Sequence, residues 1–173
     1  MKGGRRPAAP NQQETSETLM AAALKILARR SCSEGELRER LIAKQPAGAS
    51  WVDDCIGRLK ELGYLNDELF AHNYASYRVA AKPLGRAKLA RELARKKVSA
   101  GAIGDALDLV FAEDTEERLI ERAVSRYIRA HGRPADRGGT RRLFDHLARR
   151  GFEYDLIMRK LRELKMETEE GLQ

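Results

Sequence analysis

The chain has 173 residues and a net charge of +7; 42% of its residues are hydrophobic, 34% are charged and only 6% are aromatic. This balance is typical of helices with narrow apolar stripes, and it excludes a disordered chain. A membrane span is excluded as well, because the longest apolar run, near Leu19–Leu24, falls far below the roughly 20 residues that a membrane helix needs. Two cysteines, Cys32 and Cys55, are too few for a disulfide framework, so we expect reduced packing residues.

The first predicted elements are a flexible tail and a group of three helices. Residues 1–16 are rich in Gly, Pro, Ala and Gln and contain no apolar segment, so we expect a tail without a signal peptide and a cytoplasmic protein. The apolar spacing within Leu19–Leu27 predicts a first helix. Ser33–Glu36 is a capping box that begins a second helix, and a third helix ends at Gly63.

The same pattern then returns twice along the chain. A helix begins at Asn66 or Asp67, a break follows at Lys82–Gly85, and Ser99 precedes a further helix. A third round breaks at Gly132–Gly139. In each round the middle helix carries two leucines four residues apart, and the pairs recur at intervals of 52 and 54 residues: Leu37 and Leu41, Leu89 and Leu93, Leu143 and Leu147.

These patterns predict an all-α protein of three tandem three-helix repeats. No stretch alternates with a period of two for long enough to make a strand. A unit of about 50 residues buries little apolar surface alone, so we expect neighbouring modules to stack, share their cores and form an elongated, curved body. Short connections such as Gly63-Tyr64-Leu65 argue against three independent beads. The predicted boundaries are 1–16 for the N-terminal tail, 17–64, 65–112 and 113–166 for the three modules, and 167–173 for the C-terminal tail.

No group of residues suggests catalysis, a metal site or a bound cofactor. The three histidines, His72, His131 and His146, lie in different predicted helices without a Cys or carboxylate at ligand spacing. Neither a phosphate-binding glycine loop nor a nucleophile elbow occurs. The acidic pairs Asp53-Asp54 and Glu116-Glu117 are explained as first-turn residues that complement helix dipoles. We therefore expect a protein that is not an enzyme and has no cofactor.

The charges are grouped in bands along the chain. Residues 78–97 hold eight basic and one acidic side chain, and residues 122–150 hold nine basic and two acidic ones. Between them, residues 98–121 hold one basic and seven acidic side chains. We refer to 78–97 and 122–150 as the first and second basic bands. Such grouping indicates a surface suited to charged partners, whereas an even scatter would indicate only solubility.

Both basic bands fall on middle helices of the repeat. Lys88, Arg91 and Arg95 lie opposite Leu89 and Leu93 on a helical wheel and form a cationic ridge. A solvated face and a docking surface for phosphate or carboxylate both explain one such ridge, and its recurrence in the third module favours docking. The candidate partner-binding residues are Arg78, Lys82, Arg86, Lys88, Arg91, Arg95, Lys96, Arg133, Arg137, Arg141, Arg142, Arg149 and Arg150.

Aromatic residues gather elsewhere in the sequence. Tyr64 precedes a stripe at helical spacing formed by Phe70, Tyr74 and Tyr77, which favours packing in the core over a role as a binding hot spot. Stacking aromatics are absent next to the basic ridges in the sequence, so recognition of single strands by base stacking is not favoured.

Three segments carry a resemblance to a known family. Gly63–Ala71, followed by Tyr74 and Arg78, resembles the signature of RecX, the bacterial regulator of the recombinase RecA. Here Pro83 precedes Leu84, whereas that family often shows Gly-Pro before its middle-helix arginine. The likeness covers about residues 19–112 well and continues weakly to about 165. Two further blocks resemble the family: Gly85-Arg86 with Leu89, Glu92-Leu93 and Lys96-Lys97-Val98, and Ala23-Leu24 through Arg29 with Ser33-Glu34 and Glu36-Leu37-Arg38.

This resemblance implies three tandem three-helix modules and a specific task. A RecX protein is expected to bind along the groove of the RecA–DNA filament and to suppress strand exchange, ATP hydrolysis and the coprotease activity that triggers the SOS response. We expect a monomer, and direct contact with single- or double-stranded DNA stays open. Two alternatives remain from the residues themselves: a DNA-binding protein of helix-turn-helix type, and an all-α adaptor for another protein.

Overall fold

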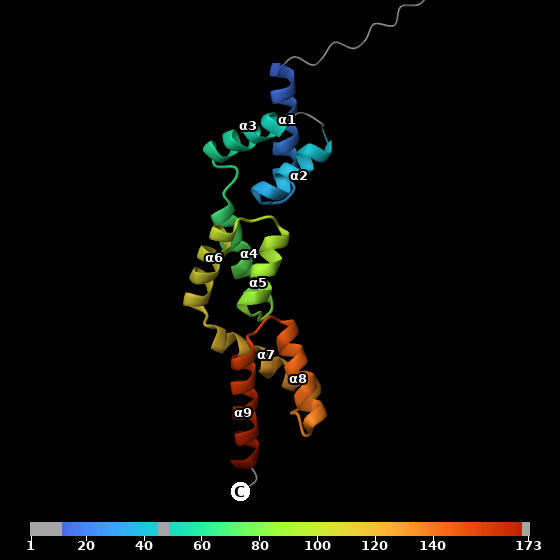
Figure 1. Cartoon of the computed structure of the whole chain (residues 1–173), viewed down its shortest axis with the longest axis vertical. Helices are drawn as coiled ribbons and strands as arrows, with labels where there is room; N and C mark the ends of the chain where they lie inside the picture. The colour runs from blue at the N-terminus through green and yellow to red at the C-terminus, as the bar shows by residue number, and fades with distance from the viewer. Residues whose placement is uncertain (1–11, 45–48, 171–173) are drawn as a thin grey trace, which may run out of the picture. The chain divides into compact units, whose positions relative to one another are not determined.

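The computed structural model describes residues 12–44 and 49–170, and Figure 1 shows their arrangement. In these two stretches all the regular elements are α-helices, nine in number, which confirms the all-α prediction. The chain divides into two units, Met1–Asn66 and Asp67–Gln173. Among the described residues, no helix combines the length and the apolar character needed to cross a bilayer.

The first unit contains three helices, α1 (Gln12–Leu27), α2 (Glu34–Lys44) and α3 (Ala49–Glu61), which pack against one another in all three pairs. Their core includes the fully buried Leu19, Leu37 and Leu41. Cys32 and Cys55 lie in the same core as free thiols, and burial raises the pKa of Cys55. The cysteines are therefore packing residues, as the sequence predicts.

Local signals in the first unit set the helix ends. The Ser33 hydroxyl accepts a hydrogen bond from the Glu36 amide at 3.1 Å, so the predicted capping box starts α2. Gly63 has φ +75°, a conformation that favours glycine, and the Tyr64 amide donates to the Leu59 carbonyl at 2.9 Å. These bonds end α3. Asp53 and Asp54 lie in its second turn instead of the first, and Asp53 forms an ion pair with Arg38 at 3.0 Å.

The second unit contains the remaining six helices. In chain order they are α4 (Asp67–Ala81), α5 (Arg86–Arg95), α6 (Ala100–Glu113), α7 (Glu116–His131), α8 (Arg137–Arg149) and α9 (Tyr154–Glu170). Nineteen buried residues form one continuous core that runs from α4 through α9. The second and third rounds of the repeat thus share a core.

The repeated leucines occupy equivalent places. All six side chains of the three pairs are fully buried: Leu37 and Leu41 in α2, Leu89 and Leu93 in α5, and Leu143 and Leu147 in α8. The leucine repeat in the sequence therefore marks equivalent core positions in the middle helix of each round.

The aromatic stripe of α4 does not form its core face. Ala71, Ala75 and Val79 are the buried residues of α4, and this helix packs against α6. Small side chains let two helices approach closely, so the larger rings stand beside the contact instead of within it. Tyr77 is 71% exposed, and Tyr64 in the first unit is 58% exposed. The prediction of core packing was wrong for these two tyrosines, whereas Phe70 and Tyr74 pack against the core edge.

A tight junction joins the α4–α5 turn to the α8–α9 turn. The Gly85 amide donates to the Arg150 carbonyl at 2.9 Å, and a Cβ at Gly85 would collide with the backbone of Gly151. Gly151 itself has φ +84° and lies against Lys88. The Arg150 guanidinium donates to the Pro83 carbonyl at 3.0 Å. The glycines are required here by the close approach of two backbones.

Side-chain caps begin three of these helices. Ser99 accepts from the Ala102 amide, as predicted, and Thr115 accepts from the Arg118 amide. Asp136 accepts from the Gly139 amide at the start of α8. Glu116 lies in the first turn of α7, and its carboxylate also accepts the Arg86 amide at 3.0 Å. That carboxylate thereby caps α5, whose N-cap Gly85 has no side chain, and its burial raises its pKa.

Candidate anion-binding site

The first basic band presents a cationic ridge on α5. Arg91 and Arg95 are exposed, Lys88 is half-buried, and the three lie on the side of the helix away from Leu89 and Leu93. Arg91 donates its Nε–H to the Ala87 carbonyl at 3.1 Å. Neither Arg91 nor Arg95 forms an ion pair within residues 12–44 and 49–170, so their charges face solvent.

Arg78 in the same band is half-buried and bound to side chains of the protein. Its guanidinium makes two 2.8 Å hydrogen bonds to the carboxylate of Glu92, and the Tyr74 hydroxyl donates to the same carboxylate at 3.2 Å. The Arg78 hydrogen bonds hold the pKa of Glu92 below its ordinary value and raise the pKa of Arg78. The bidentate pair ties α4 to α5.

Two further cations of this band contact neighbouring side chains. The Arg86 guanidinium pairs with Asp108 and lies 5.9 Å from the centre of the Phe111 ring. Lys96 lies over Tyr74 at 5.0 Å and over Phe70 at 5.8 Å. Lys82, by contrast, is exposed in the turn after α4.

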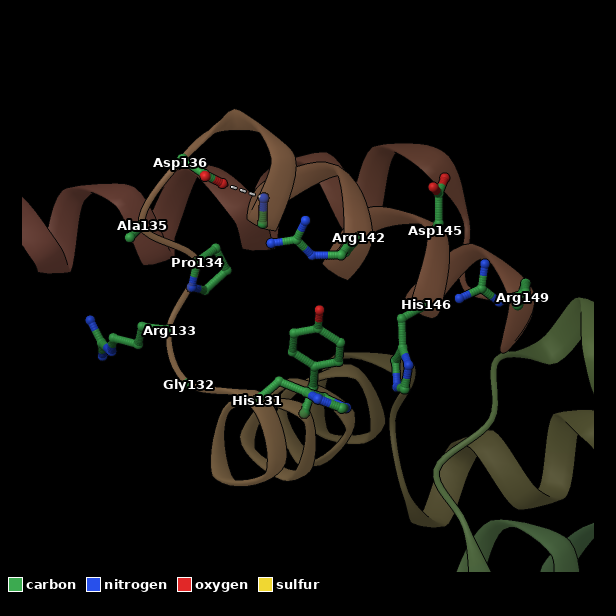
Figure 2. Close-up of a pocket in the computed structure, with 12 residues that line it drawn as sticks. His131, Gly132, Arg133, Pro134, Ala135, Asp136, Arg142, Asp145, His146 and Arg149 are labelled. Carbon is green, nitrogen blue, oxygen red and sulfur yellow. Dashed lines mark hydrogen bonds between the residues drawn. The ribbon is translucent and has the colours of Figure 1, made fainter.

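The second basic band surrounds a hollow between α7 and α8, shown in Figure 2. The hollow has a volume of about 590 Å³. It is bounded by the C-terminal end of α7, the loop that follows and one face of α8. Its lining residues are Tyr127, His131, Gly132, Arg133, Pro134, Ala135, Asp136, Gly139, Arg142, Asp145, His146 and Arg149.

The arginines of this hollow are only partly neutralised. Arg142 and Arg149 are exposed, and neither forms an ion pair in the part of the chain that the structure describes. Of the two carboxylates in the lining, Asp145 pairs with Arg141 at 3.2 Å, and Asp136 is engaged with the Gly139 amide. The hollow therefore keeps a positive electrostatic character.

The pKa of His146 is lowered in part by these positive charges. Burial and then the nearby charges of Arg150, Arg149, Lys82 and His131 lower its pKa to about 4. Arg150 donates its Nε–H to the His146 Nε2 at 2.9 Å, which requires an unprotonated nitrogen there. Burial and the charge of Arg126 lower the pKa of Arg150 in turn. His146 is accordingly neutral at physiological pH.

Three rings meet at the base of this hollow. The Tyr127 ring lies 4.7 Å from the His131 ring and 4.9 Å from the His146 ring, measured between centres. The expectation that aromatics are absent beside the basic ridges was therefore wrong for the third module. Tyr127 and His131 come from α7, and His146 comes from α8, so only the packing of these helices brings them to the arginines.

The remaining predicted residues of the second band lie around the hollow. Arg133 lines it, and Arg133 and Arg137 also border an adjoining hollow against α9 that contains Leu161 and Leu164. Arg141 points elsewhere, over the Phe144 ring at 5.9 Å. Arg150 is taken up by His146 and Pro83 at the junction. No group of three or more potential metal ligands occurs among the residues described.

A family model described as "RecX, second three-helix domain" matches residues 66–107. The protein named "Regulatory protein RecX" from Pelodictyon phaeoclathratiforme is 32% identical over 145 residues, which cover 84% of this chain and 88% of that protein. The chain belongs to the RecX family. A RecX protein from Streptomyces coelicolor is 35% identical over 136 residues, 78% of this chain and 68% of that one.

A solved structure agrees with the family assignment. The crystal structure of RecX from Lactobacillus salivarius superimposes with a TM-score of 0.77 and covers 89% of this chain and 99% of that chain. At 19% identity this likeness shows the shared all-α fold. The named relatives are regulatory proteins, so this chain is a RecX-family regulatory protein.

Proposed function

We propose that this RecX-family protein regulates RecA, mainly as an inhibitor, by binding in the groove of the RecA–DNA filament. Bound there, it suppresses recombinase, ATPase and SOS coprotease activity. Family membership supports RecA as the partner. The observation that carries the proposal is the set of exposed, unneutralised arginines on the equivalent helices α5 and α8: Arg91, Arg95, Arg142 and Arg149.

Two cationic helices in one chain suit a partner with a repeated surface. A filament offers the same acidic or phosphate surface at each repeat, and a chain with two cationic helices can contact more than one such surface. The second contact then forms at a high effective concentration and adds affinity without the full entropy cost of association. Obstruction of the groove excludes the second DNA strand and repressor substrates.

The test is RecA's DNA-dependent ATPase, titrated with the full chain at substoichiometric amounts. We expect the wild-type protein to slow ATP hydrolysis and the Arg91→Glu, Arg95→Glu double variant to do so at least about tenfold more weakly, since each of the two lost cation contacts costs about 1–3 kcal/mol. Arg162→Glu is the matched control for the single variant Arg91→Glu, because both change the net charge equally, and Arg162 is exposed on α9 and donates to the carbonyl four residues earlier, as Arg91 does.

Two results would count against the proposal. If a folded wild-type protein leaves the ATPase unchanged, the partner is another protein and the adaptor alternative stands. If it binds bare duplex more tightly than RecA-coated single strands, and with less dependence on salt, the helix-turn-helix alternative stands. Equal loss in Arg162→Glu would show that net charge alone matters.

A further inference from the structure

We propose that the hollow between α7 and α8 binds a phosphorylated nucleoside, either free or as one unit of a single strand. The site contains no residue of the α5 ridge and requires no RecA. The hollow shares Arg142 and Arg149 with the proposed RecA-binding surface, but its ligand is tested without RecA, so failure of this inference and failure of the proposed function can be told apart.

Size is the first argument. The hollow measures about 590 Å³. Small-molecule sites in proteins span about 300–1,000 Å³, and a lone phosphate would leave most of this space empty. A nucleoside phosphate fills such a volume with one charged end and one flat, ring-shaped end.

The phosphate of such a ligand fits beside the arginines that line the hollow. In Figure 2, Arg142 and Arg149 project from α8 beside the hollow, whereas the Arg133 side chain on the loop extends away from them. A guanidinium presents a planar pair of donors that matches two phosphate oxygens. Asp145 and Asp136 do not compete strongly, because Arg141 and the Gly139 amide already engage them.

The base of such a ligand fits against the rings of Tyr127, His131 and His146. Tyr127, His131 and His146 offer aromatic surface beside the arginines, and His131 is exposed. Base–aromatic stacking contributes about 1–3 kcal/mol per base and tolerates any base. These rings decide between a nucleotide and an acidic peptide, because a peptide carboxylate would use the arginines and leave the aromatic surface without a partner.

The Arg150–His146 bond keeps one of these rings neutral. Since Arg150 donates to Nε2, the ring carries its proton on Nδ1. Charged or titratable groups face this imidazole from several sides: Arg149 at the end of α8 and Arg150 directly after it, His131 of α7, and Lys82 of the turn after α4. An anion bound among them offsets these charges and raises the pKa of His146 from about 4.

The experiment uses the full chain without RecA. Binding of a fluorescent oligothymidylate is followed by anisotropy, with dTMP, thymidine and inorganic phosphate as competitors. Competition by dTMP identifies a free nucleotide as a ligand, and binding of the oligomer alone identifies the strand as the source. Equal competition by inorganic phosphate and dTMP would overturn the role of the base.

Variants assign the binding to the hollow. The Arg142→Ala, Arg149→Ala double variant should lose affinity about tenfold or more, because it removes two charge-assisted contacts. Arg129→Ala is the control: Arg129 is exposed on α7, which also borders the hollow, but it does not line the hollow, so the loss should stay below about threefold. Equal loss in both variants, or no binding by the wild type, would overturn the proposal.

A second measurement does not depend on any variant. The imidazole resonances of His131 and His146, followed by NMR, should shift on addition of dTMP or the oligomer, and the pKa of His146 should rise. Resonances that stay in place while the ligand binds would locate the binding elsewhere and refute the assignment.

Discussion

Replacement of Gly85 by alanine tests the junction between the α4–α5 and α8–α9 turns. The added Cβ would meet the carbonyl of Gly151 and the amide of Phe152, both backbone atoms that cannot swing aside. The turns must therefore separate, and the Gly85–Arg150 and Arg150–Pro83 hydrogen bonds weaken.

The expected loss can be worked out from these contacts. Overpacking costs about 1–3 kcal/mol, and each of the two hydrogen bonds contributes about 1 kcal/mol. We expect Gly85→Ala to lower the free energy of unfolding of the second unit by about 3–5 kcal/mol, which corresponds to a fall of roughly 12–20 °C in its midpoint at about 4 °C per kcal/mol.

The assay is thermal unfolding by circular dichroism together with amide hydrogen exchange. In Gly85→Ala, hydrogen exchange at the amides near residue 85 should accelerate, because the junction opens. In Arg150→Ala, exchange at the Gly85 amide should accelerate for the same reason. Gly104→Ala is the matched control: Gly104 lies in α6 with no atom within 4 Å of an added Cβ, so alanine should be neutral or stabilising by about 0.5–1 kcal/mol. A Gly85→Ala protein as stable as the wild type would refute the close approach.

Two further substitutions probe the second unit. Leu89→Ala removes a fully buried side chain and should cost about 2–5 kcal/mol in urea unfolding; a loss near zero would contradict its core position. Glu92→Gln removes the negative charge of the Arg78–Glu92 ion pair and should lower the free energy of unfolding by about 1–2 kcal/mol at neutral pH. Because the folded pKa of Glu92 lies below its ordinary value, its contribution is present above that value and is lost as the pH falls through the folded pKa. Wild type and Glu92→Gln should thus converge in stability at acidic pH, and a gap that persists there would exclude the ion pair as its cause.

Features with local causes could be predicted from the sequence. The leucine pairs recur because each round repeats one core helix, and all six side chains are buried. Ser33 and Gly63 act through backbone atoms a few residues away, so their roles follow from neighbouring letters alone. These signals together predict the all-α fold, the start of α2 and the end of α3.

Features that depend on packing between helices could not be predicted from the sequence. The aromatic spacing of α4 suggested a core stripe, but Ala71 and Ala75 are the residues buried in the core, and they permit a closer contact with α6. Tyr127 and His146 lie far apart in sequence and meet only because α7 packs on α8. The spacing of His146 to Arg142 and Arg149 along α8 was the one available hint, and it carries no information about α7.

The structure also separates the cations of the basic bands into two kinds, which a sequence cannot do. Arg78 and Arg150 are half-buried and bind acceptors on other elements, so they hold helices and turns together. Arg91, Arg142 and Arg149 are exposed, and none has an ion pair among the residues described. Loss of the first kind should lower stability and, only through it, binding. Loss of the second kind should lower binding at unchanged stability, because surface charges away from a network alter folding by little, about 0.5 kcal/mol or less. Stability and affinity measured on the same variants therefore distinguish a scaffold arginine from a contact arginine, and one basic band contains both.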